Sequence, residues 1–99
     1  MELRNLYYFL QVCEDKSFSA AAAKLYITQQ ALSKSVKALE RELGCELFQK
    51  SGNGLQLTAY GTAIYPICRD MVRNFEASLQ KIRAIAPDGA SPIRLTTAY

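Results

Sequence analysis

Hydrophobic residues recur at three- and four-residue steps from the start of the chain to about residue 15. This spacing places apolar side chains on one face of an amphipathic helix. We therefore predict a first helix over residues 2–15. Its apolar face consists of Leu3, Leu6, Leu10 and Cys13, with Tyr7 and Phe9 beside them.

A second helix, short and rich in alanine, is predicted to follow at once. Either Ser17 or Ser19 is suited to cap its first turn, because a serine hydroxyl accepts a hydrogen bond from a free backbone N–H. Alanine favours the helix and also lets a neighbouring backbone approach closely, as a tight corner between helices requires. The residues predicted to face inward are Phe18, Ala21, Ala22 and Leu25.

A third helix is predicted over Gln29–Leu43, after a corner at residues 26–28. Thr28 is a suitable N-cap, and Gly44 supplies the left-handed residue that ends the helix. Two helices joined by such a corner form a helix-turn-helix. This motif presents the first residues of its second helix to the major groove of DNA.

The third helix has a buried stripe with a polar arc beside it. At ~100° per residue, its apolar residues share one face, and the adjoining arc holds amide, hydroxyl and amine groups with no acid before Glu40. Such groups bind base edges and phosphates, although an ordinary solvated surface would show the same pattern. The stripe consists of Leu32, Val36, Leu39 and Leu43, and the arc consists of Gln29, Gln30, Ser33, Lys34, Lys37 and Arg41.

The hydrophobic period changes from helical to alternating after Gly44. Apolar residues at 47–48 and 55–57 flank residues 51–54, where two glycines and an asparagine tolerate positive φ. This pattern predicts a short β-hairpin, with a bare connector packed on the helices as the alternative. Directly after a helix-turn-helix, a hairpin with a basic residue at its shoulder, here Lys50, is typical of the wing that flanks DNA-binding helices.

Residues 58–86 are predicted to form one long helix that Thr58 caps. At ~1.5 Å per residue it would reach ~40 Å, which is long for so small a domain. Pro66 removes a backbone hydrogen bond to Thr62, so we expect a kink or a late start there. The apolar stripe either pairs with the same helix of a second subunit, which we predict, or folds back on its own domain. The predicted dimerisation residues are Ile64, Cys68, Met71, Phe75, Leu79 and Ile82.

The last residues have a different character. Residues 87–92 have the composition of a linker, and residues 93–99 alternate like a single β-strand. Because one strand is not stable alone, we expect the chain to be a fragment that ends inside a further domain.

The net charge of +3 does not by itself identify a nucleic-acid partner, but acids avoid two windows of the chain. Residues 17–38 hold three lysines and no Asp or Glu, and residues 47–69 hold Lys50 and no Asp or Glu. Short acid-free windows also arise by chance. Both windows coincide with the elements predicted to face DNA, which favours a basic DNA-facing surface.

Composition argues against several other classes. A chain of 99 residues with 49% hydrophobic and 21% charged residues suits one small globular domain. No apolar run approaches the ~20 residues of a membrane span, and the start lacks a secretory pattern, so we expect a cytoplasmic location. Histidine is absent, and the sequence has no paired acids in one apolar setting and no glycine loop that would cradle a phosphate, so neither a metal, a cofactor nor an enzyme is expected. Three widely spaced cysteines are predicted to be small buried hydrophobes: Cys13, Cys45 and Cys68.

A series of ordered positions resembles the N-terminal signature of LysR-type bacterial transcriptional regulators. The resemblance covers about residues 1–86 and is specific, because it rests on many positions in order rather than on one short motif. It implies a winged helix-turn-helix, a linker helix that dimerises it, and an effector domain like a periplasmic binding protein from about Ile93. The matching positions are Phe9, Ser17-Phe18-Ser19, Ala21-Ala22, Leu25, Gln29, Ser33, Leu39-Glu40, Leu43-Gly44, Leu47-Phe48, Leu57-Thr58 and Gly61.

Three positions depart from the pattern of the family. Gln30 occupies a position at which the family generally has proline, and Lys50 occupies one at which the family usually has arginine. Asn53 stands where a wing arginine often enters the minor groove, so we expect different wing contacts. The resemblance further implies binding to interrupted palindromes near promoters, with DNA contacts from Gln29, Ser33 and Lys34.

We therefore predict a mainly α chain with a small β-hairpin. It comprises a winged helix-turn-helix over residues 1–62, a dimerisation helix over 58–86, and a linker with the first strand of an effector domain over 87–99. It is expected to bind double-stranded DNA as a homodimer and to regulate transcription, with a small-molecule effector held by the absent domain; a helical protein-interaction module is the alternative. The predicted DNA-binding residues are Ser17, Thr28, Gln29, Gln30, Ser33, Lys34, Lys37, Lys50 and Asn53.

Overall fold

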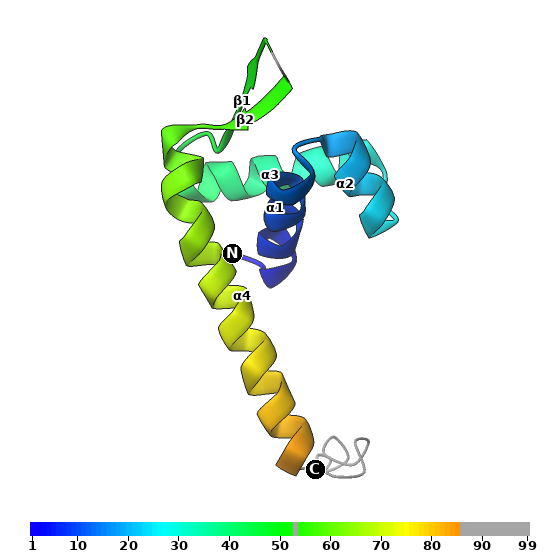
Figure 1. Ribbon diagram of the computed structural model, residues 1–99, viewed down its shortest axis with the longest axis vertical. Coiled ribbons are helices and arrows are strands. Elements are labelled where there is room, and N and C mark those ends of the chain that lie inside the picture. Colours follow the sequence, from blue (N-terminus) through cyan, green and yellow to red (C-terminus); the bar gives the residue numbers. More distant parts are fainter. Residues whose placement is uncertain (53, 86–99) are drawn as a thin grey trace.

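The computed structural model describes residues 1–52 and 54–85, which form four helices and one two-stranded sheet (Figure 1). Asn53 and the predicted linker and strand at residues 87–99 lie outside the described residues. The prediction of a mainly α fold with a small β-hairpin is confirmed. The elements in chain order are α1 (Leu3–Asp15), α2 (Phe18–Leu25), α3 (Gln29–Leu43), β1 (Phe48–Ser51), β2 (Gly54–Leu57) and α4 (Ala59–Ile85).

Side-chain caps fix where the second and third helices begin. Ser17, and not Ser19, caps α2, because its Oγ accepts the Ala20 N–H at 3.1 Å. Thr28 caps α3 in the same way by accepting the Ala31 N–H at 3.0 Å. The corner between α2 and α3 is thus closed by local hydrogen bonds that satisfy free N–H groups of the first helical turn.

A left-handed residue follows each of the first three helices: Lys16 with φ 54°, Tyr26 with φ 59° and Gly44 with φ 75°. Glycine adopts this conformation freely, whereas a side chain with a Cβ pays roughly 1–2 kcal/mol. Backbone hydrogen bonds offset that cost, such as the 2.7 Å bond from the Lys16 N–H to the Val12 carbonyl. These turns make the sharp corners between α1, α2 and α3 possible.

Two clusters of buried side chains form the core. The first joins α1, α3 and α4, and the second joins α1, α2 and α3. The ring of Phe48 packs against both, with its centroid 5.5 Å from that of Phe9 and 5.7 Å from that of Phe18. The start of β1 is therefore held by both halves of the core. The first cluster consists of Leu6, Phe9, Leu39, Leu47, Cys68 and Val72, and the second of Val12, Ala21, Ala22, Leu32 and Val36.

The predicted hairpin is confirmed, and its base is tied to the helices. β1 and β2 pair antiparallel, with Phe48 opposite Leu57. The Leu47 N–H donates to Glu40 Oε2 at 2.7 Å, and the Thr58 N–H donates to the Leu47 carbonyl at 2.9 Å. The hairpin projects from the helical part at the end of the molecule opposite to the tip of α4 (Figure 1).

The long helix α4 runs without interruption through Pro66. It begins at Ala59, where Thr58 Oγ1 accepts the Gly61 N–H at 3.0 Å, so the expectation of a late start at the proline was wrong. The cap at Thr58 explains this, because it starts the helix two turns before the proline. The first half of α4 packs on the core as far as Val72, and Glu76 Oε2 accepts a hydrogen bond from Tyr7 Oη at 3.1 Å. The rest of the helix runs away from the domain (Figure 1).

Candidate nucleic-acid interface

The first turns of α3 carry an exposed polar surface. Gln29, Gln30, Lys34 and Lys37 are exposed, and Ser33 is half-buried. They stand outward because the apolar stripe on the other side of α3 is buried in both core clusters. We call these five residues the recognition surface. The solvated arc predicted from the sequence is therefore accessible to a ligand from outside.

Two predicted contact residues have structural roles as well. The hydroxyl oxygens of Ser17 and Thr28 accept backbone N–H groups of α2 and α3. A hydroxyl that accepts in this way still has its own hydrogen to donate. Contact with DNA by these residues stays a prediction, and removing either hydroxyl would also weaken a helix start.

A groove runs between α3 and the hairpin. Gln29, Ser33 and Lys37 line it on the helix, and Gln49 and Lys50 line it on β1. Lys50 is exposed, as its predicted contact with phosphate requires. The hairpin therefore places an ammonium group beside the recognition surface, and amides, a hydroxyl and lysines face one open space, which Glu40 and Glu46 also line.

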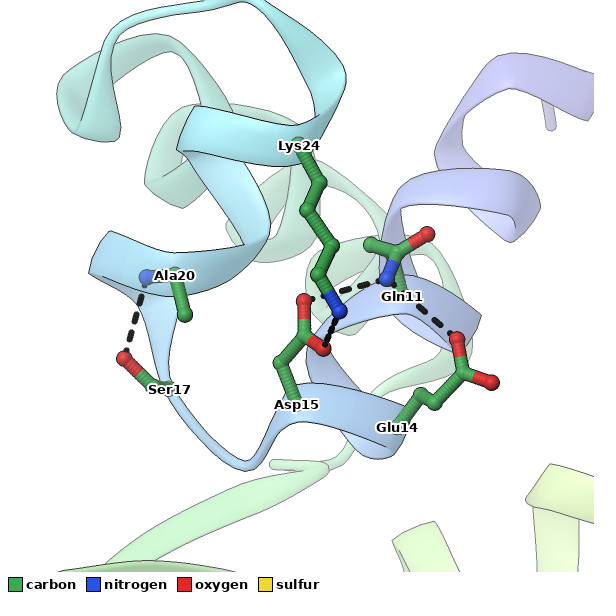
Figure 2. A network of polar contacts seen from close by, with 6 residues as sticks. All are labelled: Gln11, Glu14, Asp15, Ser17, Ala20 and Lys24. Atoms are coloured by element: carbon green, nitrogen blue, oxygen red, sulfur yellow. Dashed lines mark hydrogen bonds and ion pairs between the residues drawn. The ribbon is translucent and has the colours of Figure 1, made fainter.

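Lys24, a lysine of the first acid-free window, is paired within the chain. Figure 2 shows its Nζ against Asp15, where it donates to Oδ1 at 2.7 Å, while Gln11 Nε2 donates to Asp15 Oδ2 at 3.0 Å. Glu14 Oε1 accepts from the same Gln11 amide at 3.3 Å. The ammonium of Lys24 and the amide of Gln11 hold the pKa of Asp15 below its usual value, and Asp15 raises the pKa of Lys24. This network ties α1 to α2, and it leaves Lys24 with a partner other than phosphate.

We expect Asp15→Asn to lower the free energy of unfolding at pH 7 and to leave it nearly unchanged in acid. A carboxyl with a lowered folded-state pKa stabilises the fold above its unfolded pKa of about 3.9, and this contribution is lost as the pH falls through the folded value. Urea denaturation at pH 7 and at about pH 2 measures the difference. Asp70→Asn, at an exposed position of α4, is the matched control. An equal decrease in the free energy of unfolding at both pH values would contradict a stabilising role of the charged Asp15 carboxylate.

One contact at the recognition surface was missed in the sequence analysis. Ser19 Oγ donates to Gln29 Oε1 at 3.1 Å and so joins the first turn of α2 to the first residue of α3. The sequence analysis considered Ser19 as a candidate cap and as a position of the family signature, but not as a partner of Gln29. The signal for its real position was weak, because the contact spans ten residues and forms only when the helix-turn-helix corner closes.

The predicted dimerisation residues divide into two groups. Cys68 is 3% exposed and belongs to the first core cluster. Because its own domain covers it, its side chain is not available for contact with a second subunit. Ile64 and Leu79 are half-buried. Met71, Phe75 and Ile82 are exposed, and Ile67 and Ile85, which the sequence analysis did not select, are exposed beside them. We call these five residues the exposed stripe; they fall within a ~80° arc at ~100° per residue.

The three cysteines are free thiols. Cys68 is buried as predicted, whereas Cys13 and Cys45 are half-buried. Burial raises the pKa of Cys13 to about 12 and also raises the pKa of Cys68, so both are protonated at neutral pH. A protonated thiol is a poor nucleophile, which fits a packing role.

The part of the chain that the structure describes has neither a cluster of metal ligands nor a membrane-spanning helix. Across residues 1–52 and 54–85, no three Cys, Asp or Glu side chains are grouped as a metal site would need. Within the same ranges, no helix combines the length and apolar character needed to cross a bilayer.

Residues 3–62 match a family profile described as "Bacterial regulatory helix-turn-helix protein, lysR family". The chain belongs to the LysR family. The match runs from α1 through the hairpin into the first turn of α4. The matched segment therefore contains the recognition surface and Lys50. The resemblance inferred from the sequence is therefore confirmed.

Curated relatives of this LysR-family chain are named as regulators. It is 33% identical over 95 residues to the HTH-type transcriptional regulator TfdT of Cupriavidus pinatubonensis, an alignment that covers 96% of this chain and 42% of TfdT. It is 41% identical over 86 residues to the HTH-type transcriptional regulator BudR of Klebsiella aerogenes, which covers 87% of this chain and 60% of BudR. The chain thus spans about two fifths of TfdT and three fifths of this BudR.

Solved structures of the family match the fold closely. The chain superposes on the BenM DNA-binding domain in the crystal structure of its complex with catB site 1 DNA with a TM-score of 0.82 and 36% identity, over 87% of this chain and 97% of that one. The CbnR DNA-binding domain in its DNA complex gives a TM-score of 0.80 and 36% identity, over 87% of this chain and 99% of that one. The fold described here is therefore that of the LysR DNA-binding domains.

Proposed function

We propose that this chain binds double-stranded DNA as the DNA-binding and dimerisation part of a transcriptional regulator. The observation that carries the proposal is the recognition surface, whose amides and lysines are exposed beside the half-buried Ser33 at the start of α3. Similar domains, those of BenM and CbnR, were crystallised with DNA, which supports the same use of the surface here. The alternative, a helical interaction module that does not bind DNA, has no comparable support.

Base readout is assigned to the start of α3 and affinity to the lysines. Glutamine amides and the Ser33 hydroxyl suit base edges in the major groove, whereas Lys34, Lys37 and Lys50 suit phosphates or guanine acceptors. Asn53 remains proposed as a weaker or differently selective wing contact. Phosphate neutralisation supplies most of the affinity in such complexes and makes it dependent on salt.

The proposed active species is a homodimer that pairs the exposed stripe of α4. Five large apolar side chains remain exposed there, and a symmetric partner would bury them. Two recognition helices would then enter successive major grooves about 34–36 Å apart, or a multiple of that distance, on an interrupted palindrome. We propose the domain boundaries given above, with residues 87–99 leading into an effector-binding domain, and a place of action on DNA in the bacterial cytoplasm.

Gln29→Ala or Gln30→Ala is expected to cost about 1–3 kcal/mol on the preferred duplex and little on random DNA, because base contacts discriminate. Lys50→Ala is expected to weaken binding to every duplex alike and to lower the slope of log affinity against log salt. Titration of labelled duplexes at several salt concentrations measures both effects, after selection of the preferred sequence from a random pool.

Gln80→Ala and Lys81→Ala, at exposed positions near the far end of α4, are the matched controls. Equal losses on preferred and random DNA for the glutamine variants would remove them from base readout. An absence of salt-dependent affinity for any duplex would overturn the proposed function and favour the interaction module.

A further inference from the structure

The starting observation is the hydrogen bond from Ser19 Oγ to Gln29 Oε1, 3.1 Å long, between two exposed side chains. Ser19 is not needed to start α2, because Ser17 already caps that helix. Gln29 is the first residue of α3 and lies in the groove beside the hairpin. The side chain of Ser19 on α2 thus holds the side chain of Gln29, which is the first residue of the recognition surface on α3.

This bond orients the amide of Gln29. A glutamine amide has an accepting oxygen and an NH₂ group with two hydrogens to donate. In the arrangement that the structure shows, Ser19 donates to the oxygen, so the NH₂ group of Gln29 points away from Ser19. Within residues 1–52 and 54–85, no acceptor for Gln29 Nε2 is found at hydrogen-bond distance. Both N–H donors of Gln29 are therefore left for a ligand, whereas its oxygen already accepts one hydrogen bond from Ser19.

We propose that Ser19 is a positioning residue that holds Gln29 as a hydrogen-bond donor to a purine edge in the major groove, guanine above adenine. Guanine presents two acceptors there, N7 and O6, whereas adenine presents one acceptor beside a donor and cytosine presents a donor. An oriented amide also loses less side-chain freedom on binding than a free one. The inference rests on the proposed function, since it assigns a partner to a residue of the same surface.

The experiment is a double-mutant cycle of Ser19→Ala and Gln29→Ala in the whole chain. Affinity is measured on the selected duplex and on a series of duplexes in which each position in turn carries each of the four base pairs. Ser19→Ala is expected to weaken binding about threefold to tenfold, and only at the base pair that Gln29→Ala affects. In the Gln29→Ala background, Ser19→Ala is expected to change affinity less than about twofold. The preferred base pair at that position is expected to be G·C in either orientation, with A·T in either orientation second.

Ser19→Thr keeps a hydroxyl and is the conservative control, expected to restore the base preference. The midpoint of thermal unfolding is expected to be the same in all variants, because the bond lies on the surface. Losses that add up would overturn the proposal, because they would show that Ser19 and Gln29 act independently. A loss for Ser19→Ala that falls equally on all duplexes would also overturn it and make Ser19 a phosphate contact. A preference for A·T or T·A over both G·C and C·G at that position would also overturn it. An absence of binding to any duplex would instead overturn the proposed function.

Discussion

Replacing Gly61 with alanine is expected to lower the free energy of unfolding by about 3 kcal/mol. A Cβ at this position would lie 2.3 Å from the Leu47 carbonyl oxygen and 2.7 Å from Leu57 Cδ2. The carbonyl cannot move away cheaply, because it accepts the Thr58 N–H and Leu47 is fully buried. The same exchange at an unhindered helical position would stabilise the fold by roughly 0.5–1 kcal/mol, so the sign itself is informative.

Urea denaturation monitored by circular dichroism measures this change, as a shift of the midpoint at constant slope. Gly52→Ala is the matched control, because nothing lies within 4 Å of its Cβ position. It is expected to stay within about 0.5 kcal/mol of the parent chain. A Gly61→Ala chain as stable as the parent would show that the base of the hairpin can yield and that α4 is not fixed to it.

Met71→Glu is expected to weaken the proposed dimer by about a hundredfold or more, which corresponds to roughly 3 kcal/mol. Met71 is 43% exposed and lies in the exposed stripe of α4. In a symmetric dimer the substitution would bury two carboxylates in an apolar contact, and neither would have a partner. Affinity for a two-half-site duplex should fall with the dimer, while affinity for a single half-site should hold.

Sedimentation velocity over a range of concentrations measures the dimer, and the same duplex titrations measure its effect on DNA binding. Gln80→Glu is the matched control, since it adds the same carboxylate at an exposed position roughly 180° around α4 from Met71. An unchanged dimer in Met71→Glu would place the subunit contact elsewhere than the exposed stripe.

Local chemistry made the first three helices predictable from the sequence. The bounds of α3 were predicted exactly as found, because its cap residues, Thr28 and Gly44, act on backbone groups within four positions of themselves. The hairpin was predictable for the same reason, since its glycines lie between alternating apolar residues. The exposed polar arc of α3 followed from the burial of the opposite face.

Features that depend on contacts between elements were not predictable in the same way. Periodicity marked one continuous stripe on α4, and only the packing of α1 and the hairpin against it shows that Cys68 is covered while Phe75 is not. The pairing of Lys24 with Asp15 and the bond from Ser19 to Gln29 both cross a corner of the chain. Sequence spacing carries no signal for such geometry.

The exposed second half of α4 has a mechanical consequence. The last hydrogen bond between this helix and its own domain is the 3.1 Å bond that Tyr7 Oη donates to Glu76 Oε2, and from Glu76 the helix extends for about 14 Å to Ile85. In the proposed dimer, the other subunit would support this end of the helix. The angle at which two such rods cross would then determine the distance between the two DNA-reading ends, so a change at the crossing would alter which half-site spacing the protein tolerates.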